Sequence, residues 1–269
     1  MLNRRHFHFD AIGVWTFVSI AILSIPTVLI LYYGLAVYRS PAGFGTAVIV
    51  SMLLTLLAAG TSTIAVFILF TPAAFHLSRQ KNDILETATD IPVSIPHPII
   101  GIALLLLSTK LTPFGRFLNE LGINLFYTIQ GMIAALIIVS APIYIRSAQS
   151  LFSARSRDSE LFAYSMGASR FRYLFSILIP SSSRELLSAS LTSMARAISE
   201  FGSIAVIAYI VTSPPIFSGT MYMSVLIYQY YNYYGPQVAV TAAAFMIVIS
   251  IAIPVAVRLL RRGGHSNVH

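Results

Sequence analysis

The chain has 269 residues, of which 57% are hydrophobic and only 10% are charged. A soluble domain carries about 25% charged residues, so this composition excludes a soluble enzyme or binding domain as the main part of the chain. The formal net charge is +8, and we assign it to the cytoplasmic loops of a membrane protein rather than to contact with nucleic acid. The absence of cysteine excludes disulfides, thiolate metal ligands and a cysteine nucleophile.

Six apolar segments recur along the chain, and a helix needs about 20 such residues to cross a membrane. Because they continue to the C-terminal end, a removable signal peptide does not explain them. The second segment exceeds the membrane thickness and is expected to tilt or to project into the cytoplasm. The sequence therefore predicts an all-α membrane protein with a single transmembrane domain over residues 1–269. The expected spans cover about residues 11–37, 47–77, 91–107, 125–145, 186–211 and 237–260.

Lysine and arginine residues are distributed unequally between the two sides of these spans. If the N-terminus lies inside, 13 of the 17 Lys and Arg residues fall in inside segments and three fall in outside loops. The remaining one, Arg196, lies within the fifth span. Because cytoplasmic loops carry an excess of Lys and Arg, this distribution predicts that both termini are cytoplasmic.

The segment 146–185, between the fourth and fifth spans, is the largest of the predicted cytoplasmic loops. Asp158 or Ser159 is expected to cap a short helix that ends at Gly167. Ser169 is expected to cap a second helix, which Pro180 ends. The loop is therefore predicted to be a helix–turn–helix whose apolar residues need a partner to bury them. These residues are Leu161, Phe162, Met166, Phe171, Leu174, Phe175 and Ile177.

The spacing within this loop resembles the EAA signature loop of ABC importer permeases. In that signature a glycine is followed by isoleucine ten residues later and by proline thirteen residues later, as at Gly167, Ile177 and Pro180. The usual Ala-Ala after the glutamate is replaced by Leu161 and Phe162. An ordinary amphipathic connector with a glycine turn is the alternative interpretation. The resemblance implies that the loop couples to a separate ATPase subunit through Glu160, Ala163, Gly167, Ala168, Ser169, Phe171, Phe175, Ile177 and Pro180.

Residues 90–105 and 196–208 resemble segments of molybdate/tungstate permeases and of the related sulfate permeases. The resemblance implies the type I ABC importer permease fold and a path for a small oxyanion, with molybdate or tungstate favoured over sulfate. It also implies a homodimer of permeases, two ATPase subunits that bind ATP and Mg, an external oxyanion-binding protein, and contact with membrane lipid. The expected location is the cell membrane of a prokaryote, crossed several times. No cofactor or metal is expected in this chain.

Arg196 and Glu200 form an ionisable pair within the fifth span, and their separation by four residues places them on one helical face. A charge within the membrane is costly, so the pair indicates either a transport path or a structural ion pair. His97 begins the third span among three prolines, where free backbone N–H groups attract anions. A histidine with a satisfied hydrogen bond at the interface is the alternative. The candidate path residues are His97, Arg196, Ser199, Glu200 and Phe201.

Motifs of other protein classes are missing from the sequence. There is no Gly-Lys dipeptide and hence no P-loop, so ATP hydrolysis is assigned to a partner. Neither His-Glu-x-x-His nor Gly-x-Ser-x-Gly occurs, so no catalytic residue is expected. A secondary transporter is the alternative from another class, although such proteins usually have internal repeats and several carboxylates within the membrane.

Overall fold

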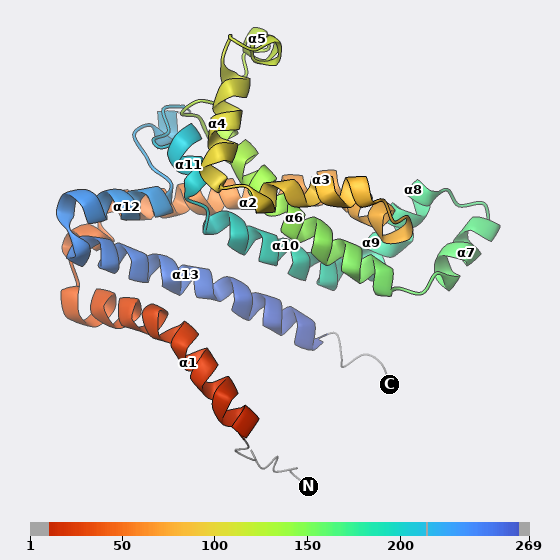
Figure 1. Cartoon of the computed structure of the whole chain (residues 1–269), viewed down its shortest axis with the longest axis horizontal. Helices are drawn as coiled ribbons and strands as arrows, with labels where there is room; N and C mark the ends of the chain where they lie inside the picture. Colours follow the sequence, from red (N-terminus) through yellow and green to blue (C-terminus); the bar gives the residue numbers. More distant parts are fainter. Residues whose placement is uncertain (1–10, 214, 264–269) are drawn as a thin grey trace. The chain divides into compact units, whose positions relative to one another are not determined.

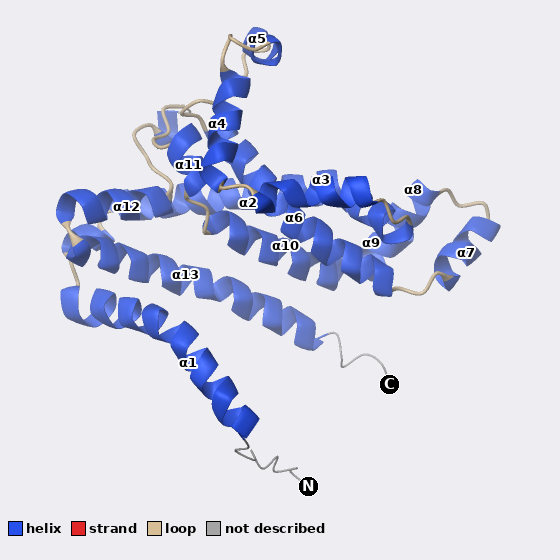
Figure 2. Ribbon diagram, viewed as in Figure 1, coloured by secondary structure: helices blue, strands red, loops and turns tan. Residues whose placement is uncertain are grey.

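The computed structural model describes residues 11–213 and 215–263. Helices and loops make up this part of the chain, and its only β pairing consists of two isolated bridges, Thr128 with Ser213 and Val211 with Thr220 (Figure 2). The chain divides into two compact units. One contains the residues up to Gly45 together with Ile227–Val248, and the other contains Thr46–Leu226 together with the residues from Ile249 onward.

The smaller unit is built around α1 (Ala11–Tyr32), which continues as a π-helix over Tyr33–Tyr38. A 3-10 turn follows at Pro41–Phe44, and the first half of α13 (Pro236–Gly263) packs against these segments. The backbones approach closely at Gly34, where a Cβ atom would lie 2.5 Å from the Cβ of Ala244. Small residues permit this close packing of membrane helices. α1 itself has no buried residue and exposes most of its apolar side chains, as expected of a helix that faces lipid.

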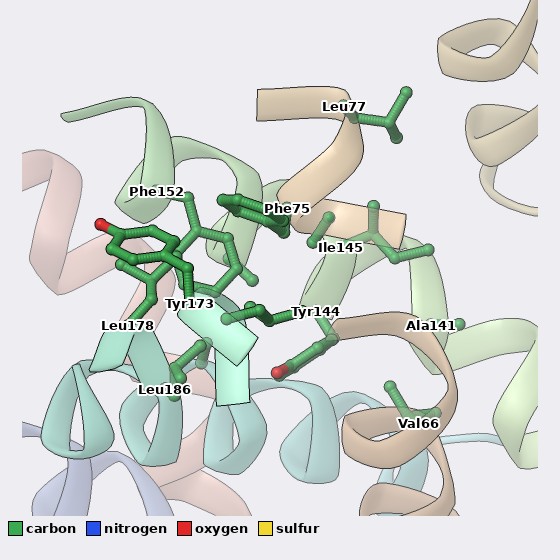
Figure 3. Packing of buried hydrophobic residues seen from close by; sticks show 14 of the residues in the cluster. Val66, Phe75, Leu77, Ala141, Tyr144, Ile145, Phe152, Tyr173, Leu178 and Leu186 are labelled. Atoms are coloured by element: carbon green, nitrogen blue, oxygen red, sulfur yellow. The ribbon is translucent and has the colours of Figure 1, made fainter. Parts of the chain in front are cut away.

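The larger unit has a core of three helices, α2 (Thr46–Arg79), α6 (Ile129–Ala154) and α10 (Ser183–Ile198). The end of α2, the second half of α6 and the start of α10 enclose a cluster of apolar side chains that includes Phe75, Tyr144 and Phe152 (Figure 3). Tyr144 is fully buried, and its hydroxyl lies 2.6 Å from Oγ1 of Thr71 on α2. At about 1.5 Å per residue, the 34 residues of α2 extend well beyond a hydrocarbon core of about 30 Å.

The third predicted span, residues 91–107, is divided between two helices. α3 (Asp83–Ser94) and α4 (His97–Ser108) meet at an angle of 103°. Ile95 between them is extended, with φ −98° and ψ 146°, because a residue before proline is pushed out of the helical region. In Figure 1, α4 turns away from the direction of α3 and leads to the short helix α5 (Pro113–Glu120).

The fifth predicted span, residues 186–211, is also interrupted. α10 ends at Ile198, and α11 (Gly202–Ile207) begins after a link of three residues. The side chain of Glu200 accepts a hydrogen bond from the backbone N–H of Ser203, at 2.8 Å, and so begins a new helix at this point. After α11 the chain passes through a 3-10 turn at Pro215–Phe217 to α12 (Met223–Tyr234).

Four helices of the described chain are long and apolar enough to cross a membrane, or five if α3 and α4 count as one bent span. These four include the segments predicted as spans one, two, four and six. The predicted total of six spans and the cytoplasmic position of both termini remain predictions. The ends of the chain themselves, residues 1–10 and 264–269, lie outside the described residues.

The 146–185 loop contains the predicted helix–turn–helix. α7 (Asp158–Ser165) is followed by Gly167, whose φ of +83° suits glycine, and then by α8 (Arg170–Tyr173). Ser169 caps α8 by accepting a hydrogen bond from the N–H of Arg172, whereas the residue before α7 is Arg157 rather than Asp158 or Ser159. Pro180 does not end the second helix, because it lies in the first turn of α9 (Ile179–Ser181), where proline is tolerated. A π-helix at Leu174–Leu178 connects α8 to α9.

Candidate functional site

The inner face of the 146–185 loop is attached to α2 by a buried ion pair. Nε of Arg79 donates to Oε2 of Glu160 at 2.7 Å, and the two side chains are 4% and 7% exposed. Nη1 of Arg79 also donates to the carbonyl oxygen of Phe152, at 2.7 Å. The hydroxyl of Tyr164 donates to Oε1 of Glu160 at 2.8 Å, and burial together with this hydrogen bond raises the pKa of Tyr164. Glu160 therefore faces the interior of the chain.

The outer face of the same loop exposes large apolar side chains. Phe162, Met166 and Phe171 are each at least 70% exposed, and the rings of Phe171 and Phe175 lie 4.4 Å apart. Leu174 differs from the prediction, because it is buried beneath the loop at 3% exposure. Clusters of exposed apolar residues mark interaction surfaces. We call the six exposed residues the apolar surface of the loop: Leu161, Phe162, Met166, Phe171, Phe175 and Ile177.

The remaining predicted coupling residues fall on both faces. Ala163 is buried, and Ala168 packs against the apolar core cluster, so both support the loop from inside. Gly167, Ser169 and Pro180 are exposed. No atom lies within 4 Å of a Cβ built on Gly167, so this glycine is required by its backbone conformation and not by crowding.

A second candidate site lies where α4 meets the break between α10 and α11. Nη2 of Arg196 donates to Oε2 of Glu200 at 2.9 Å and lies 2.8 Å from Nε2 of His97. Nδ1 of His97 lies 3.7 Å from the same carboxylate oxygen. His97 and Arg196, which are 99 positions apart in the sequence, therefore form one cluster with Glu200.

Glu200 is 1% exposed, and both of its carboxylate oxygens have partners. Oε1 accepts from the N–H of Ser203 at 2.8 Å and from its hydroxyl at 2.9 Å, while Oε2 accepts from Arg196. Its backbone carbonyl accepts from the hydroxyl of Ser224 at 2.6 Å. Buried charges are tolerated when they are paired and hydrogen-bonded in this way. Glu200 thus connects α10, α11 and the start of α12.

Two glycines bring α4 and α11 close enough for this cluster to form. A Cβ on Gly101 would lie 2.6 Å from the carbonyl oxygen of Ser203, and a Cβ on Gly202 would lie 2.9 Å from Cδ of Pro98. Any larger side chain would separate the two helices. His97, at the first position of α4, reaches Arg196 because of this close packing.

Polar side chains follow one face of α10. Thr192, Arg196 and Ser199 are spaced by four and three residues, and all three are exposed or half-buried. Nη1 of Arg196 lies 3.4 Å from Oγ of Ser199, and the Arg196 side chain is 22% exposed. Phe201, in the link between α10 and α11, is 37% exposed. Polar groups at membrane depth face a water-filled path or another subunit.

The chain matches a known family over residues 71–263, described as "Binding-protein-dependent transport system inner membrane component". It belongs to this family. The match spans every helix from the end of α2 to α13, and therefore includes the loop and the Arg196 cluster. The chain is thus the membrane permease component of an ABC importer and not its ATPase, which decides against a secondary transporter.

Several curated permeases of this family are similar in sequence. The "Molybdate/tungstate transport system permease protein WtpB" of Thermococcus kodakarensis is 31% identical over 204 residues, which are 74% of each chain. The "Probable transport system permease protein NifC" of Clostridium pasteurianum is 35% identical over 152 residues, 53% of this chain and 52% of the relative. The "Probable sulfate transport system permease protein cysT" of Prototheca wickerhamii is 31% identical over 62% of this chain and 64% of that protein.

The fold resembles that of a solved permease. The inward-facing MetNI methionine ABC transporter contains a chain that superposes with a TM-score of 0.56, covering 78% of this chain and 93% of its own length. The sequences are only 16% identical, so this similarity concerns the fold. The predicted type I ABC importer permease fold is confirmed.

Two features of the sites were not predicted from the sequence. Thr192 extends the polar face of α10, and its spacing of four from Arg196 is the signal that would have indicated it. Arg146 holds α3 against α6: Nε lies 3.0 Å from Oδ1 of Asp90, and Nη1 lies 3.2 Å from Oε2 of Glu86. The spacing of Glu86 and Asp90 by four residues is the corresponding signal. Among the described residues no group of three or more His, Asp or Glu side chains is arranged to hold a metal ion.

Proposed function

We propose that this permease forms the path through which an ATP-driven importer moves a small divalent oxyanion, molybdate or tungstate. The single observation that carries the proposal is the guanidinium of Arg196, which lies on the partly exposed polar face of α10 beside His97. Relatives named as molybdate/tungstate permeases support the choice of substrate, and a relative named as a sulfate permease makes sulfate the second candidate.

Arg196 suits an oxyanion that must bind briefly and leave. A guanidinium presents several N–H donors to an oxyanion. The hydroxyls of Thr192 and Ser199 nearby donate to the backbone carbonyls of Ser188 and Arg196, so Arg196 is the main donor of this face. Glu200 already neutralises part of the charge through its hydrogen bond to Nη2. Conduction requires binding that is weak enough for release. We therefore assign transient contact with the oxyanion to Arg196, His97, Ser199 and Phe201, and restraint of Arg196 to Glu200.

The apolar surface of the loop supports a second part of the proposal, docking of an ATPase subunit. Its side chains are too exposed to contribute to the stability of this chain alone, and burial against a partner would be favourable. ATP and Mg would then bind to that partner and not to the permease. We propose a homodimer in the cell membrane of a prokaryote, surrounded by lipid, with two ATPase subunits inside and an oxyanion-binding protein outside.

The test is reconstitution of the permease with its ATPase and binding protein in lipid vesicles, with ATP hydrolysis followed as single oxyanions are added. We expect molybdate or tungstate, but not phosphate, to stimulate hydrolysis and to accumulate in the vesicles. Stimulation by sulfate alone would identify sulfate as the substrate, and the proposal of an ATP-driven importer would stand. Absence of ATPase binding to the loop would contradict the docking proposal.

A further inference from the structure

The buried pair between Arg79 and Glu160 joins the last residue of α2 to α7, which carries part of the proposed docking surface. Arg79 also donates to the carbonyl oxygen of Phe152 in α6, and its guanidinium lies 5.5 Å from the ring centre of Phe75. One side chain therefore connects α2, the end of α6 and α7. Breaking a buried pair leaves an uncompensated charge, so these contacts persist together.

The loop offers a second ion pair for comparison. Nη2 of Arg155 lies 3.1 Å from Oε1 of Glu185, but these side chains are 38% and 50% exposed. Solvent screens an exposed pair, so it contributes little to holding two segments together. Of these two pairs, the buried one joins α7 to another helix, whereas the exposed one joins the end of α6 to α10.

α2 continues from this pair to the proposed oxyanion path. Thr55 lies 24 residues before Arg79 in the same helix, which corresponds to about 36 Å. Its hydroxyl accepts a hydrogen bond from the N–H of Met223 at 2.9 Å. The next residue, Ser224, donates to the carbonyl oxygen of Glu200 at 2.6 Å. A continuous set of contacts within one unit thus leads from the loop to the break between α10 and α11.

We propose that Arg79 and Glu160 are positioning residues that make α7 and α2 move as one body. A displacement of the loop by the ATPase then reaches the carboxylate that restrains Arg196. The inference rests on the proposed function, because it needs an ATPase docked on the loop. It reassigns Glu160, which the signature resemblance implies to be an ATPase contact, to the interior attachment of the loop.

The test compares Glu160→Gln with the matched exposed-pair variant Arg155→Met in the reconstituted complex. The measured quantities are the affinity for the ATPase, the rate of ATP hydrolysis, and the amount of molybdate imported per ATP hydrolysed. We expect Glu160→Gln to bind the ATPase as the unmodified chain does but to import at least about fivefold less molybdate per ATP, a typical effect of lost coupling between sites. Arg155→Met should leave this ratio unchanged.

A distance measurement separates positioning from local stability. The chain has no cysteine, so spin labels can be attached at Gln80→Cys and Ser165→Cys, both of which are exposed positions. The distance between the labels should stay constant through the ATP cycle in the otherwise unmodified chain. It should change on ATP binding when Glu160→Gln is added. If Glu160→Gln does not fold, Arg79→Lys takes its place, since a lysine retains the charge but lacks the separate nitrogens with which Arg79 reaches Glu160 and the Phe152 carbonyl.

The outcomes are distinguishable. An unchanged import ratio and an unchanged distance in the folded variant would overturn the positioning role while leaving the importer intact. The same holds if ATPase binding and uptake fall in proportion, because the pair would then only stabilise the loop. If the unmodified chain binds no ATPase, the proposed function fails and this inference fails with it.

Discussion

At the scale of single residues, the two buried carboxylates of the larger unit have related surroundings. The side chains of Glu160 and Glu200 are 7% and 1% exposed, and each has an arginine on one oxygen and hydroxyl or amide donors on the other. Burying a carboxylate without such partners would be strongly unfavourable. Each carboxylate therefore fixes the place where a helix begins or is attached, and neither is free to bind a ligand.

The side chain of Arg196 is more exposed than that of Glu200, so an oxyanion could reach it. This difference predicts the effect of replacing Arg196. Arg196→Ala should reduce oxyanion uptake by roughly ten- to hundredfold, because a hydrogen bond to a charged group contributes about 1.5–3 kcal/mol. Uptake by reconstituted vesicles measures the effect, and size-exclusion chromatography checks that the complex still assembles. Arg196→Lys, which retains the charge, should lose less.

Two results would contradict this prediction. Loss of the folded complex in Arg196→Ala would show that the pair with Glu200 serves mainly to hold the helices together. Normal uptake by an assembled Arg196→Ala complex would show that Arg196 does not contact the oxyanion.

At the scale of helices, close backbone packing decides where the second site forms. α4 and α11 are short, and they meet through Gly101 and Gly202 with no room for a Cβ atom. The proline-rich break between α3 and α4 turns α4 by 103° and so makes this contact possible. The position of His97 beside Arg196 is a consequence of this packing.

Gly101→Ala is expected to destabilise the protein by about 1–3 kcal/mol, because the added methyl group would overlap the Ser203 carbonyl and force α4 and α11 apart. Thermal unfolding of the purified protein in detergent measures the change. The matched control is Gly60→Ala in α2, where nothing lies within 4 Å of the added atom and helix propensity favours alanine by about 1 kcal/mol. Equal stability of the two variants would show that the Gly101 contact is not tight.

At the scale of the whole molecule, the membrane topology determines which surface meets which partner. The excess of Lys and Arg in alternate segments predicts that the 146–185 loop lies on the cytoplasmic side, where we propose that the ATPase docks. The oxyanion would then enter from the opposite side, where the α4–α5 connection is expected to lie.

Single cysteines can test this topology because the natural chain contains none. A membrane-impermeant maleimide should label Lys110→Cys in intact cells, whereas Gln80→Cys and His269→Cys should react only after permeabilisation. This pattern follows from the predicted sidedness of the loops and the C-terminal end. Labelling of Gln80→Cys from outside would show that the predicted topology is inverted. Labelling of His269→Cys from outside would show that the predicted number of spans is wrong.

Much of the local structure could be predicted from the sequence. Long apolar segments predicted α1, α2, α6 and α13, because a helix satisfies its own backbone groups in lipid. Gly167 and Ser169 predicted the helix–turn–helix, since glycine and serine have strong local preferences. These features depend on residues near one another in the chain, and so the sequence by itself determined them, together with the family.

The tertiary structure decided what depends on distant residues. Hydropathy could not reveal that α10 and α11 are separate, because the break depends on how Glu200 is hydrogen-bonded. Nor could the signature spacing show that Glu160 turns inward, because its partner Arg79 lies 81 residues away. The cluster of His97 with Arg196 likewise required α4 and α11 to pack at two glycines. Local patterns determine helices and turns, whereas the partner of a buried charge is known only once the chain has folded around it.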